Sequence, residues 1–172
     1  MRLNARCSSA RVVAALIIQV SGCRNGATIA GDEDVGARLS VFVPSEDVTL
    51  AKELYGGMTV RERLVIRSAS EWPAIWSRIH GSLTPPPDVV QPDFGTEVAV
   101  VAAMGEKSTG GFEIVIDSVT RHSRGSIVYI TEQGPGSNCM TTQALTQPVH
   151  AVRAPRTDGS IWWRERSIGE NC

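Results

Sequence analysis

Three side chains in the second half of the chain belong to the types that thiol hydrolases use: Cys139, His150 and Asp158. In such enzymes an imidazole removes the proton of a thiol and a carboxylate orients the imidazole, so that the thiolate can attack a carbonyl group. This chemistry requires a free thiol at Cys139. A cysteine that is engaged in a disulfide cannot act as the nucleophile.

Other catalytic and metal-binding patterns are not found in the sequence. It contains neither the Gly-x-Ser-x-Gly motif of serine hydrolases nor a Cys-x-x-Cys motif, and its three histidines lack the spacing of zinc ligand pairs. Residues 105–111 are rich in glycine, but Glu106 separates Gly105 from Lys107, which does not fit a phosphate-binding P-loop. We therefore expect no catalytic residue, no metal and no cofactor.

The segment 105–111 is expected instead to be a hairpin loop between two strands. Its glycines permit positive φ angles, which other residues rarely adopt. Two interpretations remain open for this loop: a tight turn without a further role, or an exposed recognition loop.

The N-terminus has the layout of a signal peptide. Arg2, Arg6 and Arg11 form a positive region without an acidic residue, and residues 12–20 are apolar except for Gln19. This run is too short to span a membrane of about 30 Å as a helix, but its length is typical of a signal-peptide core. A plain N-terminal helix would be the structural alternative.

Residues 20–23 (Val-Ser-Gly-Cys) resemble a bacterial lipobox, in which the cysteine receives the lipid. We expect residues 1–22 to be a lipoprotein signal peptide and Cys23 to carry the anchor, with an ordinary cleaved signal as the alternative. The protein would then be attached to a membrane of the bacterial cell envelope, facing the periplasm or the exterior. Two or more acyl chains are needed for stable attachment.

This location affects the remaining cysteines. Cys7 would leave with the signal peptide, so Cys139 and Cys172 would remain as an even pair in an oxidising compartment. We expect a disulfide between them, with two unpaired thiols as the alternative.

The charge balance argues against a nucleic-acid partner. The chain has 17 basic and 18 acidic residues, which leaves no basic excess for phosphate groups. Hydrophobic residues make up 42% of the sequence, which is ordinary for a folded domain. Residues 23–45 combine Gly26, Gly31 and Gly36 with an acidic run at 32–34, and we expect them to be a flexible tether before a domain at 46–172.

The elements that would position these residues are mainly strands. Runs of apolar and β-branched residues predict about six strands, at 58–67, 98–104, 114–119, 127–130, 149–153 and 160–164. The run at 98–104 is almost continuously apolar, which is typical of a strand buried on both faces. Trp72, Trp76 and Ile79 recur at helical spacing and predict one amphipathic helix that ends before Gly81. The expected fold is α+β, mostly antiparallel sheet.

The order of several short motifs resembles a known family, the C-terminal domain of the protease-complex subunit PrcB. The resemblance covers residues 57–166 and rests on residues 64–67, Glu71, Trp72, Trp76, Pro87, Asp93, Phe94, 105–112, Pro135, Gly136, Cys139, Thr142, Gln143, Thr146, Pro148, His150 and 152–155. It implies a non-catalytic accessory domain that binds a protein partner, such as a secreted protease. The residues that we expect to contact the partner are Lys107, Ser108, Thr109, Gly110, Gly111, Phe112, Thr142, Gln143 and His150.

A second resemblance gives an alternative function. Residues 107–112 (Lys-Ser-Thr-Gly-Gly-Phe) are similar to the Thr-Gly-Tyr/Phe loop of chagasin-like inhibitors of cysteine proteases. This similarity implies a protease inhibitor that acts through the 105–112 loop.

Overall fold

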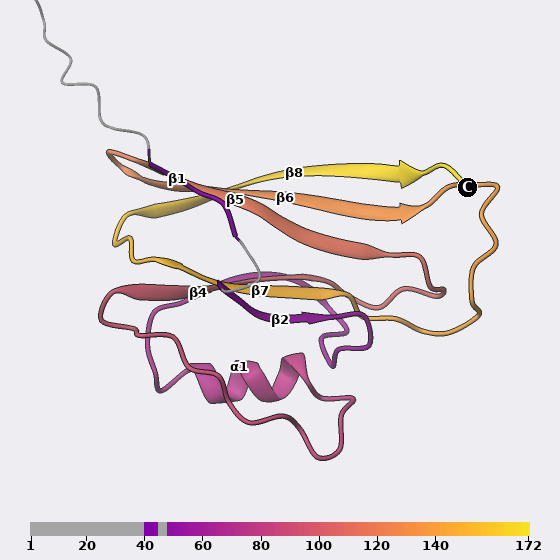
Figure 1. Ribbon diagram of the computed structural model, residues 1–172, viewed down its shortest axis with the longest axis horizontal. Helices are drawn as coiled ribbons and strands as arrows, with labels where there is room; N and C mark the ends of the chain where they lie inside the picture. The colour runs from indigo at the N-terminus through magenta and orange to yellow at the C-terminus, as the bar shows by residue number, and fades with distance from the viewer. Residues whose placement is uncertain (1–39, 45–47) are drawn as a thin grey trace, which may run out of the picture. The chain divides into compact units, whose positions relative to one another are not determined.

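Eight strands and one helix make up the part of the chain that the computed structural model describes, residues 40–44 and 48–172 (Figure 1). In chain order they are β1 (Ser40–Phe42), β2 (Thr49–Glu53), β3 (Arg61–Ile66), α1 (Trp72–Ile79), β4 (Glu97–Met104), β5 (Glu113–His122), β6 (Gly125–Pro135), β7 (Val149–Pro155) and β8 (Ser160–Glu170). The predicted signal peptide, lipid attachment at Cys23 and most of the predicted tether lie outside the described residues. β1 falls within the range 23–45 that the sequence assigns to the tether.

The strands form two sheets of four. Sheet A has the order β1-β5-β6-β8, and sheet B has the order β2-β7-β4-β3. All neighbouring strands are antiparallel except β6 and β8, which run parallel along their whole length. The α+β class with a mostly antiparallel arrangement is therefore confirmed.

The number of strands differs from the prediction of about six. β1 and β2 are additional. β2 reads Thr-Leu-Ala-Lys-Glu, and alanine, lysine and glutamate all have low β-propensity, so its sequence gives little signal. Its position depends on pairing with β7, about a hundred residues further along the chain.

Sheet B lies between sheet A and α1 (Figure 1). Alternate residues of β4 serve two cores: Val98 and Val100 pack toward sheet A, whereas Ala99 and Val101 pack toward the helix. Because both faces of β4 are covered, its sequence is apolar at nearly every position. The prediction of a strand buried on both faces is confirmed.

The helix is less clearly two-sided than the sequence suggests. Trp72, Trp76 and Ile79 are buried, but the exposed side of its eight residues begins with Pro73 and Ala74, so the contrast between the two faces is small. The prediction of an amphipathic helix is corrected to one short helix without clear amphipathicity.

The two buried tryptophans of α1 also hold the proline-rich segment that follows it. The indole nitrogen of Trp72 donates to the carbonyl of Val90 at 2.8 Å, and that of Trp76 donates to the carbonyl of Pro87 at 3.0 Å. Buried indole N–H groups need such partners. These two hydrogen bonds hold the segment against the helix, although the segment itself forms no helix or strand.

Charged residues close one side of the space between the two sheets. Arg61 and Arg63 of β3 face Glu132 of β6 and Glu165 of β8, and each arginine pairs with both glutamates. The hydrogen bond to Glu132 raises the pKa of Arg61 above its ordinary value, against the effect of burial. Burial raises the pKa of Glu165, but the hydrogen bonds and charges of Arg63 and Arg61 lower it further than burial raises it.

Candidate protein-binding surface

The loop at 105–112 connects the two sheets. β4 pairs with β3 and β7 in sheet B, whereas β5 pairs with β1 and β6 in sheet A, so the predicted hairpin between these strands is wrong. The positive φ angles that the sequence predicts for this loop occur at Gly105 (73°) and Gly111 (85°). At Gly105 a Cβ atom would also lie 2.8 Å from the backbone nitrogen of Arg61, so the turn has room only for glycine.

This loop is joined to a second segment by a short ladder of hydrogen bonds. The backbone N–H of Lys107 donates to the carbonyl of Thr146 at 2.8 Å, and the N–H of Thr146 donates back at 3.0 Å. The N–H of Gly110 donates to the carbonyl of Thr142 at 3.0 Å, and the Thr146 hydroxyl donates to the carbonyl of Thr109 at 2.9 Å. We call residues 105–112 and 141–147 together the loop junction.

Close packing in the loop junction leaves no room for a side chain at position 110. Gly110 is buried against the side chain of Thr142, and a Cβ atom at Gly110 would overlap the Thr142 hydroxyl. By contrast Ser108, Thr142 and Gln143 are exposed, so the junction presents polar side chains above a fixed backbone. The structure thus brings together eight of the nine predicted contact residues.

Phe112 lies at the foot of the loop junction between two hollows. Its ring is half-buried, and the Lys107 ammonium lies 5.5 Å from the ring centroid, in the range of a cation–π interaction. One hollow, of about 320 Å³, is lined by Met104, Lys107, Phe112, Glu132, Gln133, Gly134, Pro135, Ser167, Ile168 and Gly169. The other, of about 500 Å³, is lined by Lys52, Leu54, Gly111, Phe112, Glu113, Gln133 and Glu170.

His150 is the ninth predicted contact residue, and its side chain lies inside the protein. It is 4% exposed, and its Nδ1 accepts a hydrogen bond of 2.9 Å from the backbone N–H of Ile116, which joins β7 to β5 across the two sheets. Burial, and to a smaller extent the charge of Lys52, lowers the pKa of His150 to about 4, while Glu113 and Asp117 act in the opposite direction. We therefore do not include His150 in the loop junction.

The predicted disulfide is present. Cys139 and Cys172 are bonded, with their Cα atoms 5.2 Å apart and a sequence separation of 33. A bridge of this loop length contributes about 3 to 4 kcal/mol on the chain-entropy estimate. Because its sulfur is bonded, Cys139 does not supply a thiolate in this structure.

The adjacent tryptophans of β8 face opposite sides, because side chains alternate along a strand. Trp163 packs against the core between the sheets, whereas Trp162 is 45% exposed. Trp162 is opposite Ile127 in the register of β6 and β8, whereas Gly169 is opposite Gly134 beside the loop junction. The exposed tryptophan therefore lies at the other end of the strand and is not part of the loop junction.

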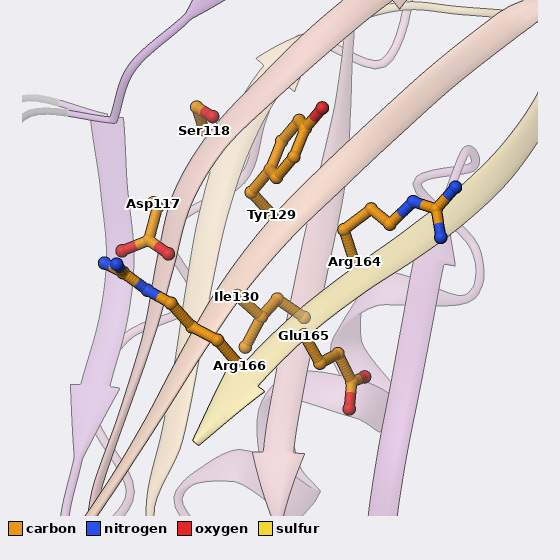
Figure 2. A pocket seen from close by; sticks show the side chains of 7 residues that line it. All are labelled: Asp117, Ser118, Tyr129, Ile130, Arg164, Glu165 and Arg166. Atoms are coloured by element: carbon orange, nitrogen blue, oxygen red, sulfur yellow. The ribbon is translucent and has the colours of Figure 1, made fainter. Parts of the chain in front are cut away.

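A further hollow, of about 400 Å³, was not predicted from the sequence. It is lined by Asp117, Ser118, Tyr129, Ile130, Arg164, Glu165 and Arg166, which come from β5, β6 and β8 (Figure 2). The Thr131 hydroxyl donates to Asp117 Oδ2 at 2.6 Å and accepts from Nε of Arg166 at 2.7 Å. Figure 2 shows Arg166 reaching across toward Asp117, whereas Arg164 extends away from it. The sequence signal that could have pointed to this site is the run of charged residues Arg164, Glu165 and Arg166 at the end of the predicted strand 160–164.

Residues 40–44 and 48–172 contain neither a cluster of metal ligands nor a membrane-spanning helix. Within this part of the chain, no group of three or more His, Cys, Asp or Glu side chains could hold a metal ion. In the same residues, no helix has both the length and the apolar character to cross a membrane.

Residues 98–155 match the family model described as PrcB C-terminal. Neither the curated proteins nor the solved structures give a match. The matched segment extends from β4 to β7 and contains both parts of the loop junction. The resemblance that the sequence motifs indicate is confirmed for these residues.

Proposed function

We propose that this chain is a non-catalytic accessory protein that binds a protein partner through the loop junction, because residues 98–155 match the PrcB C-terminal family model. The partner in this proposal is a protease, in line with the protease-complex role that the family name suggests. The chain itself supplies a binding surface and carries no catalytic step.

The observation that carries the proposal is that hydrogen bonds join the two segments of the loop junction, 105–112 and 141–147, which are far apart in the sequence. Residues 107 and 146 exchange two backbone hydrogen bonds. Two more join Gly110 to Thr142 and Thr146 to Thr109. A loop that is fixed before it binds loses little conformational freedom on association. The exposed Ser108, Thr142 and Gln143 then offer hydrogen-bonding groups in fixed positions.

The hollows on both sides of Phe112 suit the anchoring of partner side chains. Binding energy in protein interfaces is concentrated in a few residues that fill such depressions. Lys107, Glu113 and Gln133 at their rims provide charged and polar groups around a half-buried aromatic ring. An apolar partner side chain with a polar neighbour would match this arrangement.

The proposal includes a lipid anchor at Cys23 in the bacterial cell envelope. It is supported by the lipobox-like residues 20–23. The disulfide between Cys139 and Cys172 is the cysteine pairing expected of an oxidising compartment. A surface-tethered binding domain would keep its partner near the membrane.

Photo-crosslinking from the full-length chain in its native envelope tests the proposal. A photoreactive residue at Ser108 or Gln143 should yield a crosslinked product with a protease, because both side chains are exposed on the loop junction. The same residue at Ser123, in the turn between β5 and β6, serves as the control and should give no such product. Equal products from all three positions, or none from any, would contradict the proposal.

A pair of glycine variants checks that the geometry of the loop junction matters. We expect Gly110→Ala to reduce the crosslinking yield from Gln143, because the added methyl group displaces the Thr142 side chain. Gly95→Ala is the matched control, since a Cβ atom at Gly95 meets only the exposed side chain of Asp93, and Gly95 lies just before β4, at the end away from the loop junction. Circular dichroism would verify that both variants keep their secondary structure.

The turnover of the captured protease distinguishes binding from inhibition. An accessory protein should leave the cleavage of a peptide substrate unchanged or prolong the lifetime of the enzyme. A decrease in turnover that Gly110→Ala reverses would instead support the chagasin-like inhibitor.

A further inference from the structure

We propose that the open edge of β8 binds an extended acidic segment of another polypeptide as an additional strand of sheet A. This surface adjoins the loop junction only at Ile168, which lines one hollow beside Phe112, and the inference does not depend on the function proposed for the loop junction. Its parts are the backbone of β8, the exposed side chains along one face of the strand, and the hollow shown in Figure 2.

The backbone of β8 provides the first part of the argument. β8 is the last strand of sheet A and pairs with β6 from Ser160 to Glu170. No strand among residues 40–44 and 48–172 pairs with its other edge. Alternate N–H and C=O groups along that edge therefore point away from the sheet, where an extended chain can bind them.

The side chains on the outer face of β8 provide the second part. Trp162, Arg164, Arg166 and Ile168 follow one another at every second position and are all exposed. Alternate residues of a strand share one face, so these four form a single stripe with an apolar residue at each end and two cations between them. We call them the β8 stripe.

The arginines of the β8 stripe have donors that no described residue uses. Arg164 has no hydrogen bond or ion pair within the described part of the chain, and Arg166 uses only Nε, on Thr131. The hydroxyl-bearing Ser118 and Tyr129 line the same hollow of about 400 Å³. The carboxylate of Asp117 already accepts the Thr131 hydroxyl. An incoming carboxylate would therefore meet several hydrogen-bond donors at this position.

Charge also decides which occupant fits best. A symmetric antiparallel pair of two copies centred on Glu165 would place Arg164 opposite Arg166 and Glu165 opposite its own counterpart. Like charges in directly opposed positions destabilise a sheet. A strand with acidic residues opposite Arg164 and Arg166, and apolar residues opposite Trp162 and Ile168, gains favourable pairs at all four positions.

The test uses a fluorescent peptide with this alternating pattern, Val-Thr-Glu-Thr-Glu-Thr-Val, and the intact protein. Fluorescence anisotropy should detect binding that weakens as salt is added. The Arg164→Glu variant should bind at least about tenfold more weakly, because an attraction becomes a repulsion. Arg124→Glu, an exposed arginine in the turn between β5 and β6, is the matched control and should bind the peptide like the unaltered protein.

Three further peptides test the charge of the occupant and separate strand addition from simple charge attraction. A peptide with lysine in place of both glutamates should not bind. The other two peptides carry N-methyl groups on the glutamates or on the threonines. The first removes backbone donors on one edge of the extended peptide, and the second removes them on the other edge. Only one edge faces β8, so one of these two peptides should lose binding and the other should retain it. Thermal melting of the Arg164→Glu and Arg164→Gln variants verifies that the fold is intact.

Four outcomes would overturn the proposal. They are an absence of peptide binding, equal binding of the lysine peptide, equal weakening by Arg124→Glu, and unchanged binding of both N-methylated peptides. The last outcome would mean that the arginines attract the peptide without adding it to the sheet.

Discussion

His150 shows how one buried side chain can join two sheets. It stands on β7 of sheet B, and its Nδ1 accepts the backbone N–H of Ile116 on β5 of sheet A. An extended backbone has N–H groups that must find a partner when buried, and at Ile116 the neutral imidazole provides it. The ring can accept this bond only while its Nδ1 is unprotonated.

This arrangement predicts a pH dependence of stability that belongs to His150. Its pKa falls from about 6.5 in the unfolded chain to about 4 in the fold, so the unfolded state binds more protons between these values. The stabilisation is complete above pH 6.5 and is lost as the pH falls toward 4, by about 3 kcal/mol in total. Urea unfolding of wild type and His150→Gln at several pH values should show the difference between them shrinking over this range. A difference that stays constant with pH would contradict this assignment.

The residues of the loop junction illustrate a different constraint, which is space. Gly110 is buried beside Thr142, and Gly111 has a φ of 85° beside Pro135. The local sequence does not show that these two positions are restricted, because the restriction arises only in the fold. The glycines are therefore required by the neighbours that the loop meets, as well as by the turn itself.

At the scale of elements, the contact of β3 with β6 and β8 depends on charge. The side chains of Arg63 and Glu132 are only 10% and 12% exposed, and Arg63 also donates to the carbonyl of Ala103 at 2.6 Å. Removing one member of such a group leaves the opposite charge partly buried without its partner. The network therefore holds sheet A to the edge of sheet B.

We predict that Arg63→Ala lowers the free energy of unfolding by about 2 to 3 kcal/mol, somewhat less than for a fully buried ion pair. Arg78→Ala is the matched control, because the Arg78–Glu62 pair is 45% and 23% exposed and should contribute less than about 1 kcal/mol. Urea unfolding at neutral pH measures both. Equal losses in the two variants would show that the network has no special role.

The pairing of β8 also has a consequence at this scale. Parallel neighbours need a long connection, and here β7 and its flanking loops lie between β6 and β8 in the chain. The route brings Cys172, just beyond β8, next to Cys139, just beyond β6, where the disulfide joins them. The same topology leaves the second edge of β8 open for the acidic segment that we propose.

At the scale of the whole molecule, the described domain has three layers, with sheet B between sheet A and α1 (Figure 1). The loop junction joins the two sheets at one end, and the exposed Trp162 lies toward the other end of sheet A. In our two proposals, one partner binds at the loop junction and a second segment binds at β8.

The proposed anchor leads to a prediction for the whole protein. We expect Cys23→Ser to move the protein from the membrane fraction to the soluble fraction and to abolish labelling with radioactive palmitate, because stable attachment requires the acyl chains. Cys7→Ser is the matched control and should remain attached, since Cys7 lies within the expected signal peptide. Continued labelling of Cys23→Ser would contradict the assignment of the lipid site.

The sequence by itself determined the local features. The apolar run at 98–104 indicates a strand buried on both faces, and β4 is such a strand. The adjacent Trp162 and Trp163 point to opposite faces because side chains alternate along any strand. The disulfide could be predicted from the parity of the cysteines and the expected compartment.

Only the tertiary structure decided which strands pair and which side chains meet. Strand pairing depends on hydrogen bonds between residues far apart in the chain, so neither β2 beside β7 nor the crossing of the 105–112 loop between sheets is visible in a local pattern. For the same reason His150 could be recognised as a polar residue in an apolar strand, but its bond to Ile116 could not. The hollow between β5, β6 and β8 exists because three separate segments become neighbours in sheet A.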